Sequence, residues 1–138
     1  MATRRALIVE DDPEVREVTV TTFEVLGFDV VSAANAQEAL AIFDTSPVID
    51  VLFTDVRMPG GLDGFGLVRQ VRAKHPQMRV IYTSGYPGVI TSPAETFEHG
   101  PFLAKPWTFA ELQATLNTVL DATEPGHETV VRTTRRAG

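Results

Sequence analysis

Hydrophobic and polar positions along this chain switch repeatedly between two spacings. Short runs of consecutive apolar residues, such as Ala6-Leu7-Ile8-Val9, are typical of strands buried on both faces of a sheet. Between these runs, apolar residues recur every three or four positions, which indicates helices with one buried side. The runs predict five strands, at residues 6–9, 28–31, 48–53, 78–82 and 102–104. The helical spacings predict helices at residues 13–26, 36–43, 65–73 and 107–120.

Residue types at the ends of these segments support the expected helices. Pro13 suits a first helical turn, and Gly27 is well placed to end the same helix. Asn35 and Glu38 have the spacing of an N-cap with a reciprocating acid. The apolar stripe expected to face the sheet in the first helix comprises Val15, Val18, Thr22 and Leu26. The apolar side expected for the last helix comprises Phe109, Leu112, Leu116, Val119 and Leu120.

The segment between the fourth and fifth strands is less regular than the others. Gly85, Pro87 and Gly88 oppose a helix start directly after the fourth strand. Ser92-Pro93-Ala94-Glu95 suits a helix start better, because Ser can cap, Pro tolerates the first position and Glu follows three residues later. We therefore expect a short or irregular fourth helix at residues 93–98.

Strands that alternate with helices predict the class of fold. Such an order implies right-handed crossovers and a parallel sheet covered by helices. We expect an α/β domain over residues 4–121, with a doubly wound five-stranded parallel sheet and helices on both faces. Residues 122–138 contain Pro, Gly and three Arg with few apolar residues, so we expect a flexible C-terminal tail or linker there.

Composition argues against several classes of function. The chain has no cysteine, which excludes disulfides and thiolate metal sites and is compatible with a cytoplasmic location. No apolar run approaches the roughly 20 residues that cross a bilayer, so we expect no membrane segment. The formal net charge of −6 argues against direct DNA binding as the main function.

Residues capable of chemistry follow four of the five expected strands. Glu10-Asp11-Asp12 follow the first strand, Asp55 the third, Thr83 the fourth and Lys105 the fifth. The carboxyl ends of parallel strands meet at one edge, where ligands bind in such sheets. Carboxylates that lie close together repel unless a cation separates them, and Mg²⁺ prefers such oxygen ligands. A carboxylate can also attack phosphorus, with an ammonium and a hydroxyl group to neutralise the transferred charge.

Taken singly, each of these residues has a plainer explanation. An acidic triplet before a helix often serves only the helix dipole, and an Asp at a strand end is often a turn residue or a cap. Thr83 could merely cap, and Lys105 could merely be exposed. Their joint occurrence at one edge of the sheet favours a shared site.

Three segments and one threonine together resemble the receiver domain of two-component response regulators, the chemotaxis-regulator-like family. The matching parts are Leu7-Ile8-Val9-Glu10-Asp11-Asp12-Pro13, Asp55-Val56-Arg57-Met58-Pro59, the single residue Thr83 and Phe102-Leu103-Ala104-Lys105-Pro106. The resemblance covers residues 5–121. It implies a flavodoxin-like fold and a signalling module that is not an enzyme, beyond catalysis of its own phosphorylation and dephosphorylation.

The resemblance also assigns a role to each acid. Asp55 matches the phosphoacceptor, and the family's acid pair falls on Glu10 and Asp11, which leaves Asp12 as a neighbour. Asp11, Asp55 and the backbone carbonyl of Arg57 would bind Mg²⁺ (or Mn²⁺) directly. Glu10 would act through metal-bound water.

The remaining matches concern the phosphoryl group and the response to it. Thr83 and Lys105 would each bind a phosphoryl oxygen. Phe102 matches an aromatic switch residue that turns inward as Thr83 moves, although an ordinary core aromatic is a plainer interpretation of Phe102. The face that carries the response would comprise the fourth helix, the fifth strand and the fifth helix.

Two segments depart from the family's pattern. Residues 59–64 form a loop that is one residue longer than is common, so its backbone path is open. Residues 85–100 do not look like the family's regular fourth helix, which suggests partner recognition specific to a subfamily.

The resemblance implies protein partners for the module. We expect a histidine kinase or histidine phosphotransfer protein to phosphorylate it, and an unidentified protein target, with a homodimer as one possibility. With only a short tail after the last helix, it would be a stand-alone regulator or a receiver excised from a hybrid kinase.

As an alternative function, an Mg²⁺-dependent aspartyl-phosphate phosphatase fits less well, because its nucleophile would lie at the first strand. A receiver that is no longer phosphorylated is less economical, because every expected polar group is present.

Overall fold

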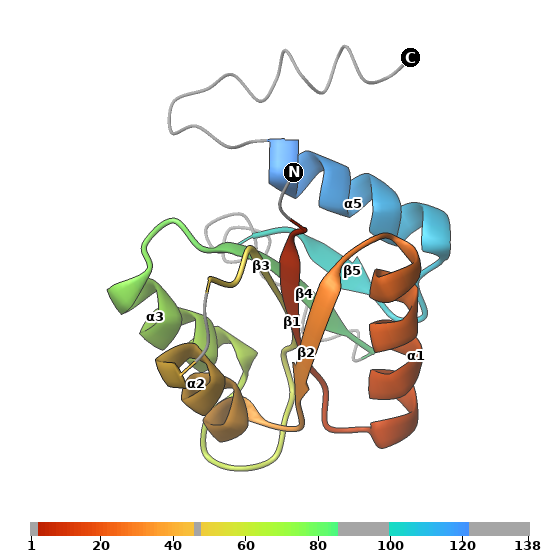
Figure 1. The fold of residues 1–138 in the computed structure, drawn as a ribbon. Coiled ribbons are helices and arrows are strands. Elements are labelled where there is room, and N and C mark those ends of the chain that lie inside the picture. The colour runs from red at the N-terminus through yellow and green to blue at the C-terminus, as the bar shows by residue number, and fades with distance from the viewer. Residues whose placement is uncertain (1–2, 46–47, 86–99, 122–138) are drawn as a thin grey trace.

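A computed structural model of the protein describes residues 3–45, 48–85 and 100–121 (Figure 1). In this part of the chain, five strands and four helices follow one another in the expected order. The strands are β1 (Arg5–Val9), β2 (Asp29–Ala33), β3 (Val51–Asp55), β4 (Arg79–Ser84) and β5 (Phe102–Ala104). The helices are α1 (Pro13–Val25), α2 (Ala36–Thr45), α3 (Gly64–Lys74) and α5 (Phe109–Asp121).

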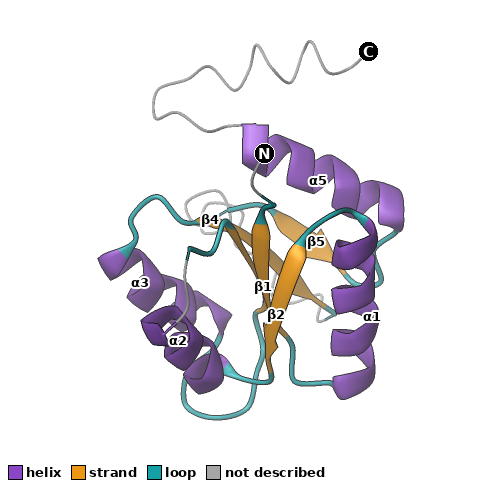
Figure 2. Cartoon of the chain, viewed as in Figure 1, coloured by secondary structure: helices purple, strands orange, loops and turns teal. Residues whose placement is uncertain are grey.

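The strands form one parallel sheet in the order β2-β1-β3-β4-β5. Helices α1 and α5 cover one face of this sheet, and α2 and α3 cover the other (Figure 2). Because all the strand pairs are parallel, the five strands end on the same side of the sheet. The doubly wound, flavodoxin-like α/β fold expected from the sequence is confirmed.

Burial on both faces explains the uninterrupted apolar run of β1. Ala6 and Ile8 belong to the apolar cluster beneath α1 and α5, and Leu7 and Val9 belong to the cluster beneath α2 and α3. All four side chains are fully buried. Successive strand residues point to opposite faces, so a strand between two helical layers needs an apolar residue at every position.

The apolar stripe expected on α1 is wrong in part, although Leu26 packs against the apolar cluster beneath α1 and α5 as expected. Val18 is 63% exposed, whereas Thr19 and Phe23, which lie outside the expected stripe, are buried. The Phe23 ring packs edge-on against Phe28 and Phe53, with ring centroids 5.4 and 5.2 Å away. The largest side chain therefore sets the rotation of the helix, and helical spacing alone does not reveal its aromatic partners.

The boundaries of β3 and α5 also differ from expectation. Val48 is 74% exposed, and the strand runs instead from Val51 to Asp55. Phe109, expected on the buried side of the last helix, is 47% exposed. It is the first residue of α5, directly after Thr108, whose backbone N–H and hydroxyl form reciprocal hydrogen bonds with Glu111. A capping box therefore begins this helix.

Local hydrogen bonds support the expected start of α2. The Glu38 N–H donates to Asn35 Oδ1 at 2.9 Å, and the Glu38 carboxylate accepts from the Ala34 N–H at 2.8 Å.

The short fourth helix expected at 93–98 and the tail at 122–138 lie outside the described residues. Among the helices that the structure describes, none combines the length and apolar character needed to cross a membrane.

The aromatic contacts of Phe23 lead to a prediction about stability. Phe23→Ala removes a fully buried ring and leaves a cavity, so we expect the free energy of unfolding to fall by about 3–5 kcal/mol. Val25→Ala, on the same helix but 70% exposed, should change it by about 0.5 kcal/mol or less. Urea denaturation of both variants measures the difference, and equal losses would contradict this orientation of α1.

Candidate functional site

The register of the parallel strands brings the predicted site residues to one edge. Val9 of β1 is paired with Thr54 of β3, so Glu10 follows β1 beside Asp55. Asp55 is paired with Thr83 of β4, and Thr83 is paired with Leu103 of β5. Lys105 follows β5 directly. The strand ends place these residues side by side although up to 95 positions separate them along the chain.

Three carboxylates lie together at this edge. Carboxylate oxygens of Glu10, Asp11 and Asp55 all lie within 4.8 Å of one another. Glu10 and Asp55 are only 4% and 5% exposed, whereas Asp11 is exposed. Three hard oxygen donors with one open side fit a small divalent cation such as Mg²⁺, which keeps part of its water shell. The donor set is therefore chemically suited to the metal that the sequence led us to expect.

The Lys105 ammonium lies between two of these carboxylates. Its Nζ is 2.7 Å from Glu10 Oε1 and 3.0 Å from Asp55 Oδ2. The Lys105 side chain is 23% exposed, so solvent screens these ion pairs only in part. One cation therefore neutralises charge on both buried acids.

The same environment shifts two pKa values. Burial is the largest influence on Glu10 and raises its pKa, and hydrogen bonds from Lys105 and the Asp12 N–H reduce this shift without cancelling it. For Lys105, burial acts to lower the pKa, but the hydrogen bonds to Glu10 and Asp55 and the attraction of these two negative charges together outweigh burial, and the pKa is raised. Lys105 therefore remains a cation throughout the neutral pH range.

Asp12 has a structural role that separates it from the acid pair. Its Oδ1 accepts hydrogen bonds from the N–H groups of Glu14 and Val15, at 2.9 and 3.2 Å, and caps α1. The plainer explanation of the acidic triplet thus holds for Asp12. Sequence reasoning missed Arg16, whose guanidinium donates to the Glu10 carbonyl at 2.8 Å and links α1 to the site.

Thr83 and Phe102 lie on neighbouring strands. The buried Thr83 hydroxyl donates a hydrogen bond to the Leu103 carbonyl at 2.7 Å. Phe102 is half-buried, and its ring stacks on that of Tyr82, with centroids 6.4 Å apart. Thr83 is therefore linked through Leu103 to the strand that carries Phe102.

The connection between β3 and α3 contains Arg57, which is exposed. Gly60 has φ of 94°, a conformation that favours glycine, so the loop turns at this residue. The loop ends at Gly64, whose N–H donates to the Val56 carbonyl at 2.8 Å. The sequence identified this stretch as a loop but did not reveal that its two ends are joined.

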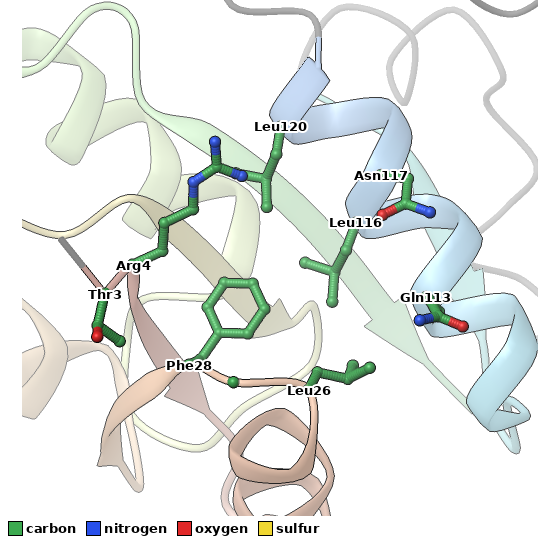
Figure 3. A pocket seen from close by; sticks show the side chains of 9 residues that line it. Thr3, Arg4, Leu26, Phe28, Gln113, Leu116, Asn117 and Leu120 are labelled. Atoms are coloured by element: carbon green, nitrogen blue, oxygen red, sulfur yellow. The ribbon is translucent and has the colours of Figure 1, made fainter. Parts of the chain in front are cut away.

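Among the cavities lined by the described residues, two lie near opposite ends of the strands. One of about 550 Å³ adjoins the acidic site and is lined by Val15 and Val18 of α1 and by Lys105 and Trp107. The other, of about 350 Å³, lies near the start of β1 and β2. Figure 3 shows its lining, in which the apolar residues are Leu26, Phe28, Leu116 and Leu120, and the polar residues include Arg4 and Asn117. Of these two cavities, only the first is lined by Lys105, the residue that contacts the clustered carboxylates.

The position of Lys105 predicts a stability that depends on pH. Lys105→Met removes the cation that lowers the pKa of Glu10, so this pKa should rise further. A carboxyl group whose pKa is higher in the folded state than in the unfolded state adds stability when the pH is below the unfolded-state pKa. This contribution is lost as the pH rises through the folded-state pKa. The substitution should therefore lower the free energy of unfolding by about 2 kcal/mol near pH 7, and by less near about pH 4.5.

Denaturant titrations of the metal-free protein at both pH values test this expectation. Lys74→Met is the matched control, because the Lys74 side chain is 75% exposed and its Nζ lies 3.8 Å from Asp44. We expect the control to change stability little at either pH. A Lys105→Met effect that is the same at both pH values would contradict the pairing with Glu10.

Comparison with known proteins agrees with this arrangement. The chain matches the response regulator receiver domain family over residues 6–117. It is 32% identical over 130 residues to the response regulator protein PilR of Pseudomonas aeruginosa, an alignment that covers 93% of this chain and 28% of PilR. The chain thus spans well under two thirds of the length of this curated relative.

Solved structures show the same fold. A response regulator receiver domain protein from Clostridium thermocellum has a TM-score of 0.78 at 26% identity, with 86% of this chain and 95% of that chain covered. The response regulator TrrA from Thermotoga maritima, solved in complex with Mg²⁺-BeF, has a TM-score of 0.76 at 25% identity, with 86% and 100% covered. The strand order, the acids at one sheet edge and the sequence match lead to one conclusion: this chain belongs to the response regulator receiver domain family of two-component signalling systems.

Proposed function

We propose that Asp55 accepts a phosphoryl group from a phosphohistidine of a histidine kinase or histidine phosphotransfer protein. The observation that carries this proposal is the Lys105 ammonium 3.0 Å from a buried Asp55 carboxylate at the strand-end edge. Residues 4–121 would form the receiver domain, with residues 122–138 as a tail or linker. The domain then acts as a signalling module that passes its state to another protein by contact.

The acids of the site can hold Mg²⁺ or Mn²⁺. Asp11, Asp55 and the Arg57 carbonyl would bind the ion directly, and Glu10 would act through its bound water. When bound, the ion supplies positive charge that offsets the repulsion between the carboxylates and an incoming phosphoryl group. The distances among Glu10, Asp11 and Asp55 support this assignment.

Asp55 and Lys105 have the main roles in the proposed phosphoryl transfer. An Asp55 carboxylate oxygen forms a bond to phosphorus as the phosphorus–nitrogen bond to the donor imidazole breaks, and the imidazole leaves with a proton from solvent. Lys105 is close enough to move from the carboxylate to a phosphoryl oxygen. Because its pKa is raised, it keeps its charge during this step.

Thr83 can convert the new charge into a change of packing. Its hydroxyl now donates to the Leu103 carbonyl, and a phosphoryl oxygen on Asp55 would compete for that proton. Loss of this bond releases the backbone of β5, which carries Phe102. The proposed response is therefore a shift of Phe102 relative to Tyr82, on the strand beside α5.

Asp55→Asn tests the acceptor. With Mg²⁺ and acetyl phosphate, the wild type should gain the mass of one phosphoryl group, and Asp55→Asn should gain none because an amide is a poor nucleophile. Intact-protein mass spectrometry measures the adduct, and removal of the metal with EDTA should prevent it. Asp44→Asn, a change at an exposed carboxylate, is the control and should label like the wild type. A wild type that no donor labels, its kinase included, overturns the proposal.

Thr83→Ala tests the response separately from acceptance. Phosphorylation should change the carbonyl ¹³C shift of Leu103 in the wild type and in Thr83→Ser, because both can exchange this hydrogen bond for one to phosphate. Thr83→Ala should still accept the phosphoryl group, more slowly by about tenfold, but should leave the Leu103 carbonyl shift unchanged on phosphorylation. An unchanged Leu103 signal in the phosphorylated wild type would rule out this route.

A further inference from the structure

The first residue of α3 lies directly against the backbone of Asp55. A Cβ atom placed on Gly64 would overlap the Asp55 carbonyl oxygen, and would lie only 2.9 Å from Val56 Cα and 3.1 Å from the Asp55 carbonyl carbon. All three contacts are with backbone atoms, which cannot rotate away as a side chain can. No residue other than glycine fits at position 64 without displacement of the Asp55–Val56 peptide.

Neighbouring glycines do not share this constraint. A Cβ on Gly61 would meet nothing within 4 Å, and a Cβ on Gly66 would meet mainly the flexible end of the Leu62 side chain. Gly64 and Gly66 are both buried and lie in the same first turn of α3. The close approach to the strand end is therefore specific to Gly64.

Hydrogen bonds of both backbone polar groups of Val56 hold the Asp55–Val56 peptide and the peptide after it in place. The Val56 N–H donates to the Thr83 carbonyl at 3.0 Å, and the Val56 carbonyl accepts from the Gly64 N–H at 2.8 Å. Asp63 Oδ1 accepts from the Gly66 N–H at 2.8 Å and so fixes the first turn of α3. The end of β3 is thus held between β4 and the start of α3.

We propose that Gly64 is a positioning residue for Asp55: its lack of a side chain lets α3 contact the Asp55–Val56 peptide and so places the Asp55 carboxylate against Lys105. This inference rests on the proposed function of Asp55. The hydrogen bond between the Gly64 N–H and the Val56 carbonyl joins the two ends of the loop between β3 and α3.

Gly64→Ala tests the placement against Gly66→Ala as a matched control. In the metal-free protein, the amide resonances of Asp55, Val56 and Thr83 should shift in Gly64→Ala and stay near their wild-type positions in Gly66→Ala. At saturating Mg²⁺ and acetyl phosphate, the phosphorylation rate constant should fall about tenfold or more in Gly64→Ala, because small displacements of a reacting group are costly. Gly66→Ala should remain within about threefold of wild type.

A second pair of variants keeps the inference testable if Gly64→Ala does not fold. Asp63→Ala and Asp63→Asn remove the same charge, but only Asn can still cap α3. Loosening of the first turn in Asp63→Ala should shift the Asp55 and Val56 amides and slow phosphorylation severalfold. Asp63→Asn should restore both measurements.

The outcomes separate this inference from the proposal about Asp55. Failure of the wild type to be phosphorylated would overturn the function of Asp55 itself. A labelled wild type together with Gly64→Ala at wild-type rate and unshifted Asp55 amide would overturn only the role of Gly64. Equal behaviour of Asp63→Ala and Asp63→Asn would do the same.

Discussion

Repulsion between buried carboxylates is the constraint on which this domain depends. Glu10 and Asp55 are almost fully buried, and Asp11 lies with them at the same edge. Burial of unpaired charges would cost several kcal/mol each, so the site needs a cation. Lys105 supplies one through two short contacts, and the acids together suit a divalent ion. The chemistry of the site thus follows from the need to balance its charge.

The parallel sheet connects this site to the two strands beyond β3. Pairing of Asp55 with Thr83, and of Thr83 with Leu103, creates a short path from β3 across β4 to β5. The Thr83 hydroxyl is hydrogen-bonded to the Leu103 carbonyl, so a change in its partner alters the next strand directly. A buried hydroxyl needs a partner, so in the proposed response exchange between the Leu103 carbonyl and a phosphoryl oxygen would give two discrete arrangements.

Helix placement could be predicted only in part from the sequence. Apolar spacing correctly located the helices and the capped start of α2, because these depend on residues within a few positions of one another. The expected buried face of α1 was wrong in part: it omitted Phe23, which packs on Phe28 and on Phe53 of β3. The expected burial of Phe109 was also wrong. It is the first residue of α5 and is partly exposed, which helical spacing alone does not reveal.

The fold class and the set of residues at the site could be predicted from local sequence patterns. Alternating helices and buried strands indicate a parallel sheet, and the residues after its strands then meet at one end of the sheet. How those residues interact became clear from the packed structure. It separated Asp12, which caps α1, from the acid pair, and placed Lys105 between Glu10 and Asp55. It also brought Gly64 against the Asp55 peptide. Distances of a few ångströms between segments far apart in the chain depend on packing, which local sequence patterns do not encode.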